Sequence, residues 1–243
     1  MMNPLFLFDV DGTLTPSRKR INIVFQAFLS VFADENDCAL VTGSDQAKTL
    51  EQLTPIMYDL FSTQFQCNGN EIYKGADNLV YISDWTLPNE CKGWLTSVLK
   101  DSTFPLRTGN HIEERNGMVN FSIVGRNATL GERKMYVEFD TDNGDRAHIS
   151  AAFNARFSEK YNVRSTIGGE TGLDITPIGK DKGQVLEDYP DREIYFFGDA
   201  CEPGGNDYPL AKLITEKQCG HVYNVSGYEE TWKILRGIRN AIS

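Results

Sequence analysis

The chain has 243 residues, of which 40% are hydrophobic and 24% are charged, so it can bury one large core or two modest ones. Its formal net charge is −10, and it contains no long run of Lys or Arg. This balance argues against nucleic acid or an anionic membrane surface as a partner.

The cysteines and the apolar segments indicate the compartment of the protein. The five cysteines are scattered and odd in number, which argues for a reducing compartment and against both a disulfide framework and a zinc site. The apolar run at the start is too short for a signal peptide. No segment approaches the roughly 20 apolar residues that a membrane span needs. We therefore expect a cytoplasmic protein that does not enter a membrane.

The first third of the chain predicts alternating strands and helices, because short apolar runs alternate with segments of helical period. The predicted elements, in chain order, are a strand at 5–10, a helix at 21–32, a strand at 38–41, a helix from Asp45 to Leu53, a strand at 65–67 and a hairpin over 70–82. The first strand ends at Asp11-Gly12, which is a turn signal.

The middle of the chain follows a different pattern. Asn116-Gly117 separates two alternating segments, and this is the strongest short hairpin signal that a sequence offers. The elements predicted here are strands at 112–114 and 118–124, helices near 129–139 and 146–161, and strands near 163–167 and 173–176. The first pattern then returns, with a helix at 181–187 and a buried strand at 193–198.

These patterns together predict the fold class and the domains. We expect an α/β protein whose core is a doubly wound, mostly parallel sheet built from residues 1–82 and 179–243. The intervening residues 83–178 are expected to form an inserted α+β cap.

Polar residues follow three of the predicted core strands. Asp9 and Asp11 stand at the end of the first strand, Thr42-Gly43-Ser44-Asp45 follows the second, and Asp199 follows the last. Ligands of open α/β sheets bind beyond the carboxyl ends of the strands. We therefore expect these residues to meet in one site.

Phosphoryl transfer needs a nucleophile, a proton donor and cations that offset charge on the phosphoryl oxygens. Asp9 is expected to attack phosphorus, and Asp11 to move the proton of the leaving or attacking hydroxyl. Mg²⁺ prefers oxygen ligands, so Asp9, the backbone carbonyl of Asp11, and Asp199 are its expected ligands. The sequence thus predicts a magnesium-dependent phosphotransferase.

Other residues leave two interpretations open. Lys182 either neutralises phosphate or is an ordinary lysine of a surface helix. Thr42 and Ser44 either contact phosphate or cap the next helix. Asn206 and Asp207 follow a Pro-Gly-Gly turn that could fold them back toward the metal, and either could instead be a helix N-cap.

The residues now point to a family. DVDGTLT, the hydroxyl-bearing motif after the second strand, Lys182 and GDACEPGGND resemble the four motifs of the haloacid dehalogenase-like phosphotransferases. Over nearly the whole chain the sequence also resembles the eukaryotic-type phosphomannomutases, in the segments FDVDGTLTPSR, GSD, IEERNGMVNFSIVGR, ER, GG…D and FFGDACEPGGND.

The resemblance implies a mutase that interconverts mannose 6-phosphate and mannose 1-phosphate through a phosphorylated Asp9, primed by a hexose 1,6-bisphosphate activator. It implies that Arg18, Arg115, Arg126 and Arg133 grip the phosphate and sugar of a phosphorylated hexose, and that Asp174 holds sugar hydroxyls. It also implies a homodimer that pairs through the cap. Arginine's planar fork suits bidentate phosphate binding.

The chain departs from that family in several places. Cys67 stands where the family usually has a glutamate, Thr42 replaces a glycine, Gly172 replaces a serine, and LAKLITEKQCG does not preserve an acidic loop. Thr-Gly is more typical of sugar phosphatases, so a capped sugar-phosphate phosphatase is the alternative. A catalytically silent phosphosugar-binding protein is a third reading, against which the retained aspartates argue. The choice between mannose and glucose stays open.

Overall fold

The computed structural model describes residues 4–242, which fall into two compact units. The core unit is built from both ends of the chain, up to Ile82 and from Lys180 onward. The cap unit is Ser83–Gly179. A single inserted segment therefore interrupts a core whose two parts lie far apart in the sequence.

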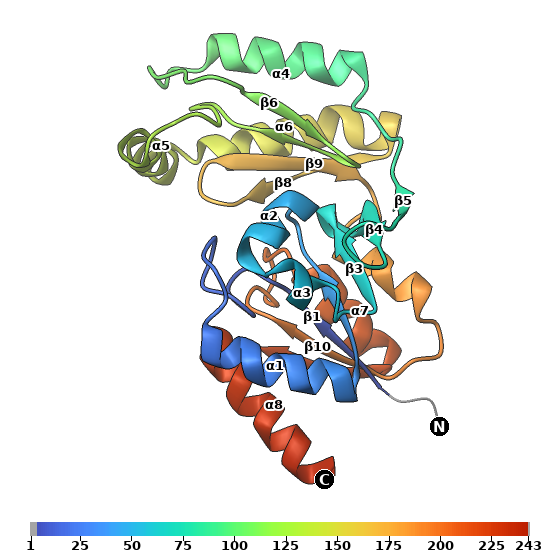
Figure 1. Ribbon diagram of the computed structural model, residues 1–243. Helices are drawn as coiled ribbons and strands as arrows, with labels where there is room; N and C mark the ends of the chain where they lie inside the picture. The colour runs from blue at the N-terminus through green and yellow to red at the C-terminus, as the bar shows by residue number, and fades with distance from the viewer. Residues whose placement is uncertain (1–3, 243) are drawn as a thin grey trace. The chain divides into compact units, whose positions relative to one another are not determined.

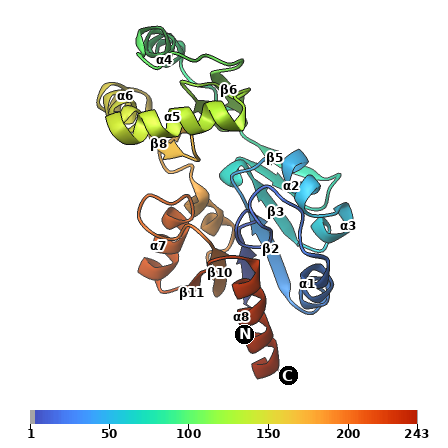
Figure 2. The same cartoon turned by 90° about the vertical axis from the view of Figure 1, so that its left-hand side faces the viewer.

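The core unit contains a seven-stranded sheet in the order β11-β10-β1-β2-β3-β4-β5 (Figures 1 and 2). Its strands are β1 (Leu5–Phe8), β2 (Asp37–Val41), β3 (Thr63–Gln66), β4 (Glu71–Tyr73), β5 (Leu79–Ile82), β10 (Ile194–Gly198) and β11 (Gly220–Asn224). The five strands from β11 to β3 are parallel, whereas β4 and β5 are antiparallel. Since β1 lies between β10 and β2, the carboxyl ends of these three strands lie side by side.

Helices cover both faces of this sheet, as Figure 2 shows for α1 and α7. The helices are α1 (Ile23–Glu35), α2 (Gln46–Gln52), α3 (Pro55–Tyr58), α7 (Tyr208–Lys217), α8 (Tyr228–Ile242) and the 3₁₀ helices η1 (Cys67–Gly69) and η2 (Lys182–Asp188). Successive side chains of a strand point to opposite faces. Phe6 and Phe8 accordingly pack in the cluster of α1 and α8, and Leu5 and Leu7 in that of η2 and α7.

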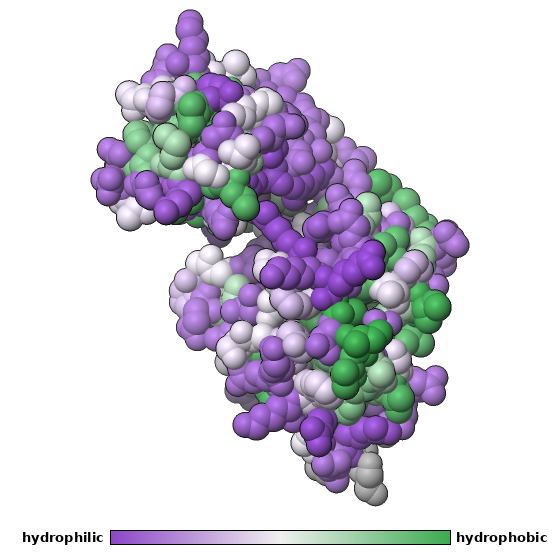
Figure 3. Space-filling model, turned by 60° about the vertical axis from the view of Figure 1, so that its left-hand side comes forward, coloured by the Kyte–Doolittle hydropathy of each residue, from purple (hydrophilic) through white to green (hydrophobic). Residues whose placement is uncertain are grey.

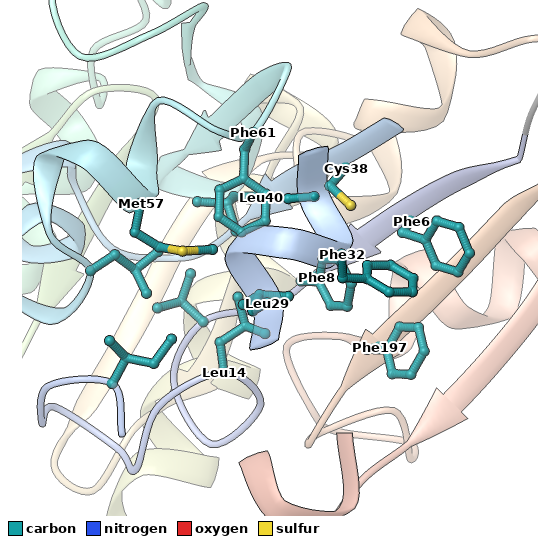
Figure 4. Packing of buried hydrophobic residues seen from close by; sticks show 14 of the residues in the cluster. Phe6, Phe8, Leu14, Leu29, Phe32, Cys38, Leu40, Met57, Phe61 and Phe197 are labelled. Carbon is teal, nitrogen blue, oxygen red and sulfur yellow. The ribbon is translucent and has the colours of Figure 1, made fainter. Parts of the chain in front are cut away.

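Aromatic packing holds β1 in place directly before Asp9 (Figure 4). The rings of Phe6 and Phe32 meet edge to face with centroids 4.8 Å apart, and those of Phe8 and Phe197 stack at 5.1 Å. Burying a side chain of this size contributes roughly 1.5–3 kcal/mol. The strand that presents Asp9 is therefore fixed between α1 and β10.

The cap unit contains a four-stranded antiparallel sheet in the order β6-β7-β9-β8. Its elements are α4 (Asn89–Asp101), β6 (Ile112–Arg115), β7 (Met118–Phe121), α5 (Leu130–Asn143), α6 (Asp145–Tyr161), β8 (Val163–Gly168) and β9 (Gly172–Pro177). Val119, Phe121 and Leu173 bury one face of this sheet against side chains of the three helices. The α/β class, with a doubly wound core and an inserted α+β unit, is confirmed.

Several predicted elements differ in detail. The hairpin around Asn116-Gly117 is confirmed, but its second strand ends at Phe121 and the prediction of strand up to residue 124 is wrong. The helix predicted at 181–187 is the 3₁₀ helix η2. We predicted neither α4 nor any element after residue 198. β11 is an edge strand with no fully buried residue, so it lacks the apolar run that marks an interior strand.

The described residues test the expectations about membrane spans and disulfides. No described helix is both long and apolar enough to cross a membrane. All five cysteines are free thiols. Figure 3 shows one face of the molecule, where hydrophilic side chains predominate and apolar ones gather in smaller patches.

Candidate active site

Three aspartates meet at the carboxyl edge of the parallel sheet. Asp9 directly follows β1, and Asp199 directly follows the neighbouring strand β10. Asp207 comes from the turn that precedes α7. One carboxylate oxygen of each residue lies within 4.8 Å of the other two. The structure thus brings Asp9 and Asp199 together, and it adds Asp207 to them. We call these three residues the core carboxylate group.

Lys182 is fully buried between two members of this group. Its Nζ donates to Asp9 Oδ1 at 2.5 Å and to Asp207 Oδ1 at 2.6 Å. The lysine is the first residue of η2, whose N-cap Asp181 accepts a hydrogen bond from the backbone of Gly183. The interpretation of Lys182 as an ordinary lysine of a surface helix is therefore wrong.

Burial opposes ionisation in this group. It raises the pKa of Asp9 to about 8 against the lowering effect of Lys182, and the charges of Asp207 and Asp199 raise it further. The pKa of Asp199 is raised by burial and by Asp207. Burial alone would lower the pKa of Lys182, but the charges of Asp207 and Asp9 raise it above its ordinary value.

The charges and atoms of this group suit a divalent cation. When all three carboxylates are ionised, they exceed the single ammonium by two negative charges, and only Asp199 of the three is exposed. Mg²⁺ takes oxygen ligands, commonly one or two carboxylates with water and phosphate. The core carboxylate group therefore fits the magnesium ion that the sequence predicts.

Gly12 permits the close approach of Asp199 to the end of β1. Its φ of +77° is a conformation that L side chains rarely adopt. A Cβ atom at this position would lie 2.0 Å from Asp199 Oδ2. Glycine is needed here both for the turn and for the space.

The side chain of Asp11 contributes no oxygen to the core carboxylate group and has donors of its own. Its Oδ1 accepts from the backbone N of Arg18 at 2.6 Å and from Gln52 Nε2 at 2.8 Å. Its Oδ2 accepts from Ser44 Oγ at 3.4 Å. Asp9 and Asp11 thus lie in different environments, which suits different roles. The expected metal contact of the Asp11 backbone carbonyl stays a prediction.

Two residues of the core site were missed or left open. Asp207 occupies the N-cap position of α7 but makes no capping hydrogen bond; its side chain binds Lys182 and accepts from the backbone N of Ala200. Asn206 is exposed. Gln52 was missed because nothing in the sequence marks a buried glutamine at the end of a short helix as a partner of Asp11.

The departures from the family motif have clear local structures. Thr42 Oγ1 accepts from the backbone N of Ser44 at 3.1 Å, which shapes the loop after β2. Cys67 has a φ of +49°, and its buried Sγ lies 3.7 Å from Glu71 Oε1. A Cβ atom at Gly172 would lie 2.6 Å from Asn120 Nδ2, so that space is already taken by the asparagine.

A row of polar side chains crosses the cap sheet. Glu113 of β6, Asn120 of β7, Asp174 of β9 and Thr166 of β8 are in register. Neighbouring residues of a strand alternate between faces, so this row lies opposite the apolar face that packs on the helices. The predicted sugar-binding Asp174 is thus the third residue of a polar row.

Two of the predicted cap arginines meet at one carboxylate. Glu113 Oε2 accepts from Arg115 Nη2 at 2.6 Å and Nε at 3.1 Å, and Arg126 Nε lies 2.9 Å from the same oxygen. Arg133, on α5, instead pairs with Glu170 at 3.4 Å. The structure therefore brings Arg115 and Arg126 together, and we call them the cap arginine pair.

Asp174 lies close enough to the cap arginine pair to interact with its charges. Burial raises its pKa above the ordinary value, while Asn120 and the charges of Arg115 and Arg126 lower it. Asn120 Nδ2 donates to Asp174 Oδ1 at 2.6 Å, and Asn120 Oδ1 is buried with no hydrogen-bond partner among the described residues. Asn120 and Glu113 were missed, although the alternation of a polar residue among apolar ones in β7 is a signal that could have found Asn120. The side chain of Arg18, in the core unit, is exposed.

Solved structures define the class of fold. A haloacid dehalogenase-like hydrolase from Bacteroides thetaiotaomicron matches with a TM-score of 0.60 and 15% identity, over 98% of this chain and 100% of that one. An IMP-nucleotidase mutant from Plasmodium falciparum matches with a TM-score of 0.64 and 16% identity, over 98% and 68% of the two chains. At such low identity these matches concern the fold alone, and that fold is haloacid dehalogenase-like.

Sequence relatives define the family. A family model for eukaryotic phosphomannomutase matches residues 25–241. A phosphomannomutase of Saccharomyces cerevisiae is 35% identical over 97% of this chain and 94% of its own length. A probable phosphomannomutase of Caenorhabditis elegans is 34% identical over 96% of this chain and 94% of its own length. The chain belongs to the eukaryotic phosphomannomutase family.

Proposed function

We propose that the chain interconverts mannose 6-phosphate and mannose 1-phosphate through a phosphorylated Asp9. The names of its relatives support the mutase reaction. The observation that carries the proposal is the core carboxylate group with Lys182 buried inside it. At the edge of one sheet, these residues supply the carboxylate that we propose as the nucleophile, a buried ammonium, and oxygen atoms suited to a metal ion.

The proposed reaction has two matched steps. Asp9 attacks phosphorus, the bond from phosphorus to the sugar oxygen breaks, and Asp11 gives a proton to that oxygen. In the return step Asp11 takes the proton of the sugar hydroxyl that attacks phosphorylated Asp9. A hexose 1,6-bisphosphate supplies the first phosphoryl group. Gln52 and Ser44 hold the Asp11 carboxylate throughout.

In this proposal, the metal ion and Lys182 both offset negative charge at the reacting phosphoryl group. Mg²⁺ held by Asp9, Asp199 and the backbone carbonyl of Asp11 would offset charge on the phosphoryl oxygens. Asp207 Oδ1 accepts a hydrogen bond from Lys182 Nζ at 2.6 Å and so holds the ammonium beside Asp9. The lysine is therefore kept where it can neutralise the Asp9 carboxylate and the phosphoryl group that joins it.

The cap residues support a mutase more than a phosphatase. A bisphosphate has a second phosphate that must be held while the first reacts, and a guanidinium fork binds phosphate well. The cap arginine pair and Asp174 supply two cations and a hydroxyl acceptor within one cluster. We assign them, with Arg133 and Arg18, to the second phosphate and the sugar.

The test is phosphorus NMR of mannose 1-phosphate incubated with the protein and Mg²⁺, with and without the bisphosphate. We expect mannose 6-phosphate to form, and the bisphosphate to accelerate it. The Asp9→Asn protein serves as the control for contaminating enzymes. Release of inorganic phosphate without any 6-phosphate, even with bisphosphate present, would instead establish the sugar-phosphate phosphatase that Thr42-Gly43 is typical of.

A further inference from the structure

Glu113 makes the contact with the cap arginine pair that a phosphate would make. One oxygen of its carboxylate takes two N–H groups of Arg115 and lies 2.9 Å from Arg126 Nε. Carboxylate and phosphate oxygens both accept charge-assisted hydrogen bonds from guanidinium groups. Glu113 Oε2 therefore occupies a position suited to an oxygen of an anionic ligand.

The charges of this cluster cancel without any ligand. The cap arginine pair faces the two carboxylates of Glu113 and Asp174. A phosphate dianion that reached the arginines would meet the Glu113 carboxylate at the same N–H groups. Like charges placed side by side are unfavourable, so one of the two anions has to leave.

Glu113 has space beside it, and the backbones of its two partners are held by other contacts. Its side chain is 32% exposed and lies on the edge strand β6, so it has solvent to turn into. The backbone N of Arg126 donates to the carbonyl of Asn110 at 2.7 Å. Arg115 ends β6 and is paired with Met118 of β7. The positions of the two arginine backbones thus do not depend on Glu113.

We infer that Glu113 is a built-in competitor of the substrate's phosphate, which holds the cap arginine pair between turnovers and lowers the affinity of the cap for phosphorylated ligands. This inference rests on the proposed function, in which the pair binds a phosphate. A mutase has to loosen its bisphosphate so that either end can face Asp9, and a returning carboxylate would promote that release. The opposite role, in which Glu113 positions the arginines for phosphate, gives an effect of opposite sign.

The experiment measures binding of inorganic phosphate to the full chain by calorimetry, in magnesium-free buffer with chelator at constant ionic strength. Without metal, the carboxylates of the core carboxylate group outnumber its one ammonium, which disfavours phosphate there. Glu113→Gln is expected to lower the dissociation constant about tenfold, since like-charge contacts in such sites are strongly unfavourable. Glu113→Ala should act in the same direction, which separates the lost charge from any new contact of the amide.

Glu114→Gln is the matched control. It removes the same charge one residue along β6, on the opposite face, where Glu114 pairs with Lys92 at 2.5 Å. Exposed ion pairs contribute little, so this variant should change phosphate affinity less than about twofold. Weaker or unchanged phosphate binding in Glu113→Gln and Glu113→Ala would overturn the inference.

Arg126→Gln separates this inference from the proposed function. A loss of phosphate affinity in Arg126→Gln, without tightening in Glu113→Gln, refutes only the competitor role of Glu113. No change in Arg126→Gln refutes phosphate binding by the cap arginine pair. That outcome refutes both the competitor role of Glu113 and the assignment of this pair to a phosphate under the proposed function. Tightening in Glu113→Gln together with a loss in Arg126→Gln supports both.

Discussion

The core carboxylate group differs in burial and in charge from the cap arginine pair and the two carboxylates beside it. Asp9 and Asp207 are buried, and when they and Asp199 are all ionised they exceed the single positive charge of Lys182 by two. The cap arginine pair is about a quarter exposed, and its two charges are balanced by two carboxylates.

This difference separates chemistry from recognition. An unbalanced buried group is costly unless a cation or ligand completes it, so the core site has the properties of an incomplete metal and phosphoryl site. A balanced, partly exposed group can exchange one anion for another at low cost. The predictions below test whether the two units divide the work in this way.

The largest effect should follow from Asp9→Asn. An amide is a far weaker nucleophile and metal ligand than a carboxylate, so we expect no measurable turnover, a loss above about 10⁴-fold. The measurement is mannose 6-phosphate formation by a protein whose circular dichroism matches wild type. Asp77→Asn, at an exposed position of the core unit, is the matched control. Activity above a few per cent in Asp9→Asn would rule out Asp9 as the nucleophile.

Asp11→Asn should act on proton transfer alone. We expect activity to fall by about 10²–10⁴-fold, which is the usual contribution of general acid–base catalysis. Since the Asp11 carboxylate is outside the core carboxylate group, the stabilisation by Mg²⁺ in thermal unfolding should stay within error of wild type. A loss of metal-induced stabilisation would show that the two aspartates act as one unit.

Arg126→Ala should raise KM more than Arg133→Ala. Charge-assisted hydrogen bonds contribute about 1.5–3 kcal/mol, so loss of one phosphate contact should raise KM for mannose 1-phosphate roughly 10- to 150-fold. Arg126 is a member of the cap arginine pair, whereas Arg133 contacts Glu170 at 3.4 Å. Steady-state kinetics of both variants decide the order, and an equal or larger effect of Arg133→Ala would mean that the phosphate lies nearer α5.

The smallest effect concerns stability without metal. Burial raises the pKa of Asp9 to about 8, so the folded protein holds this proton more tightly than the unfolded chain does. Stability of the metal-free protein should therefore fall as pH rises from about 4 toward 8. Asp9→Asn should remove this contribution and raise Tm at pH 8, with each 1 kcal/mol worth about 2–4 °C.

The control for this measurement is Mg²⁺ itself. At saturating magnesium the wild-type protein should regain stability, and the advantage of Asp9→Asn should disappear or reverse. If Asp9→Asn were instead less stable at every pH without metal, the ion pair with Lys182 would outweigh the burial of the carboxylate.

Local patterns in the sequence were enough for much of the core. The apolar run before Asp9 and the strand at 193–198 before Asp199 each predict a strand that ends at an acid, and parallel strands bring such ends to one edge. Asn116-Gly117 predicts the cap hairpin because the turn geometry is a property of these two residues. α4 was missed although the sequence carries a signal for it, because its apolar residues recur at helical spacing: Cys91, Trp94, Leu95, Val98 and Leu99.

Only the tertiary structure decided which side chains pair. Lys182 meets Asp9 across 173 residues of sequence, and Gln52 meets Asp11 across 41. Likewise, Glu113 forms ion pairs with the cap arginine pair, whereas its neighbour Glu114, which has the same charge, pairs with Lys92. The sequence by itself determined the strand ends, the hairpin and the residue types for phosphoryl transfer, because these follow from short-range periodicity and chemistry. The partners depend on strand order, register and the face to which each side chain points, and long-range packing sets all three.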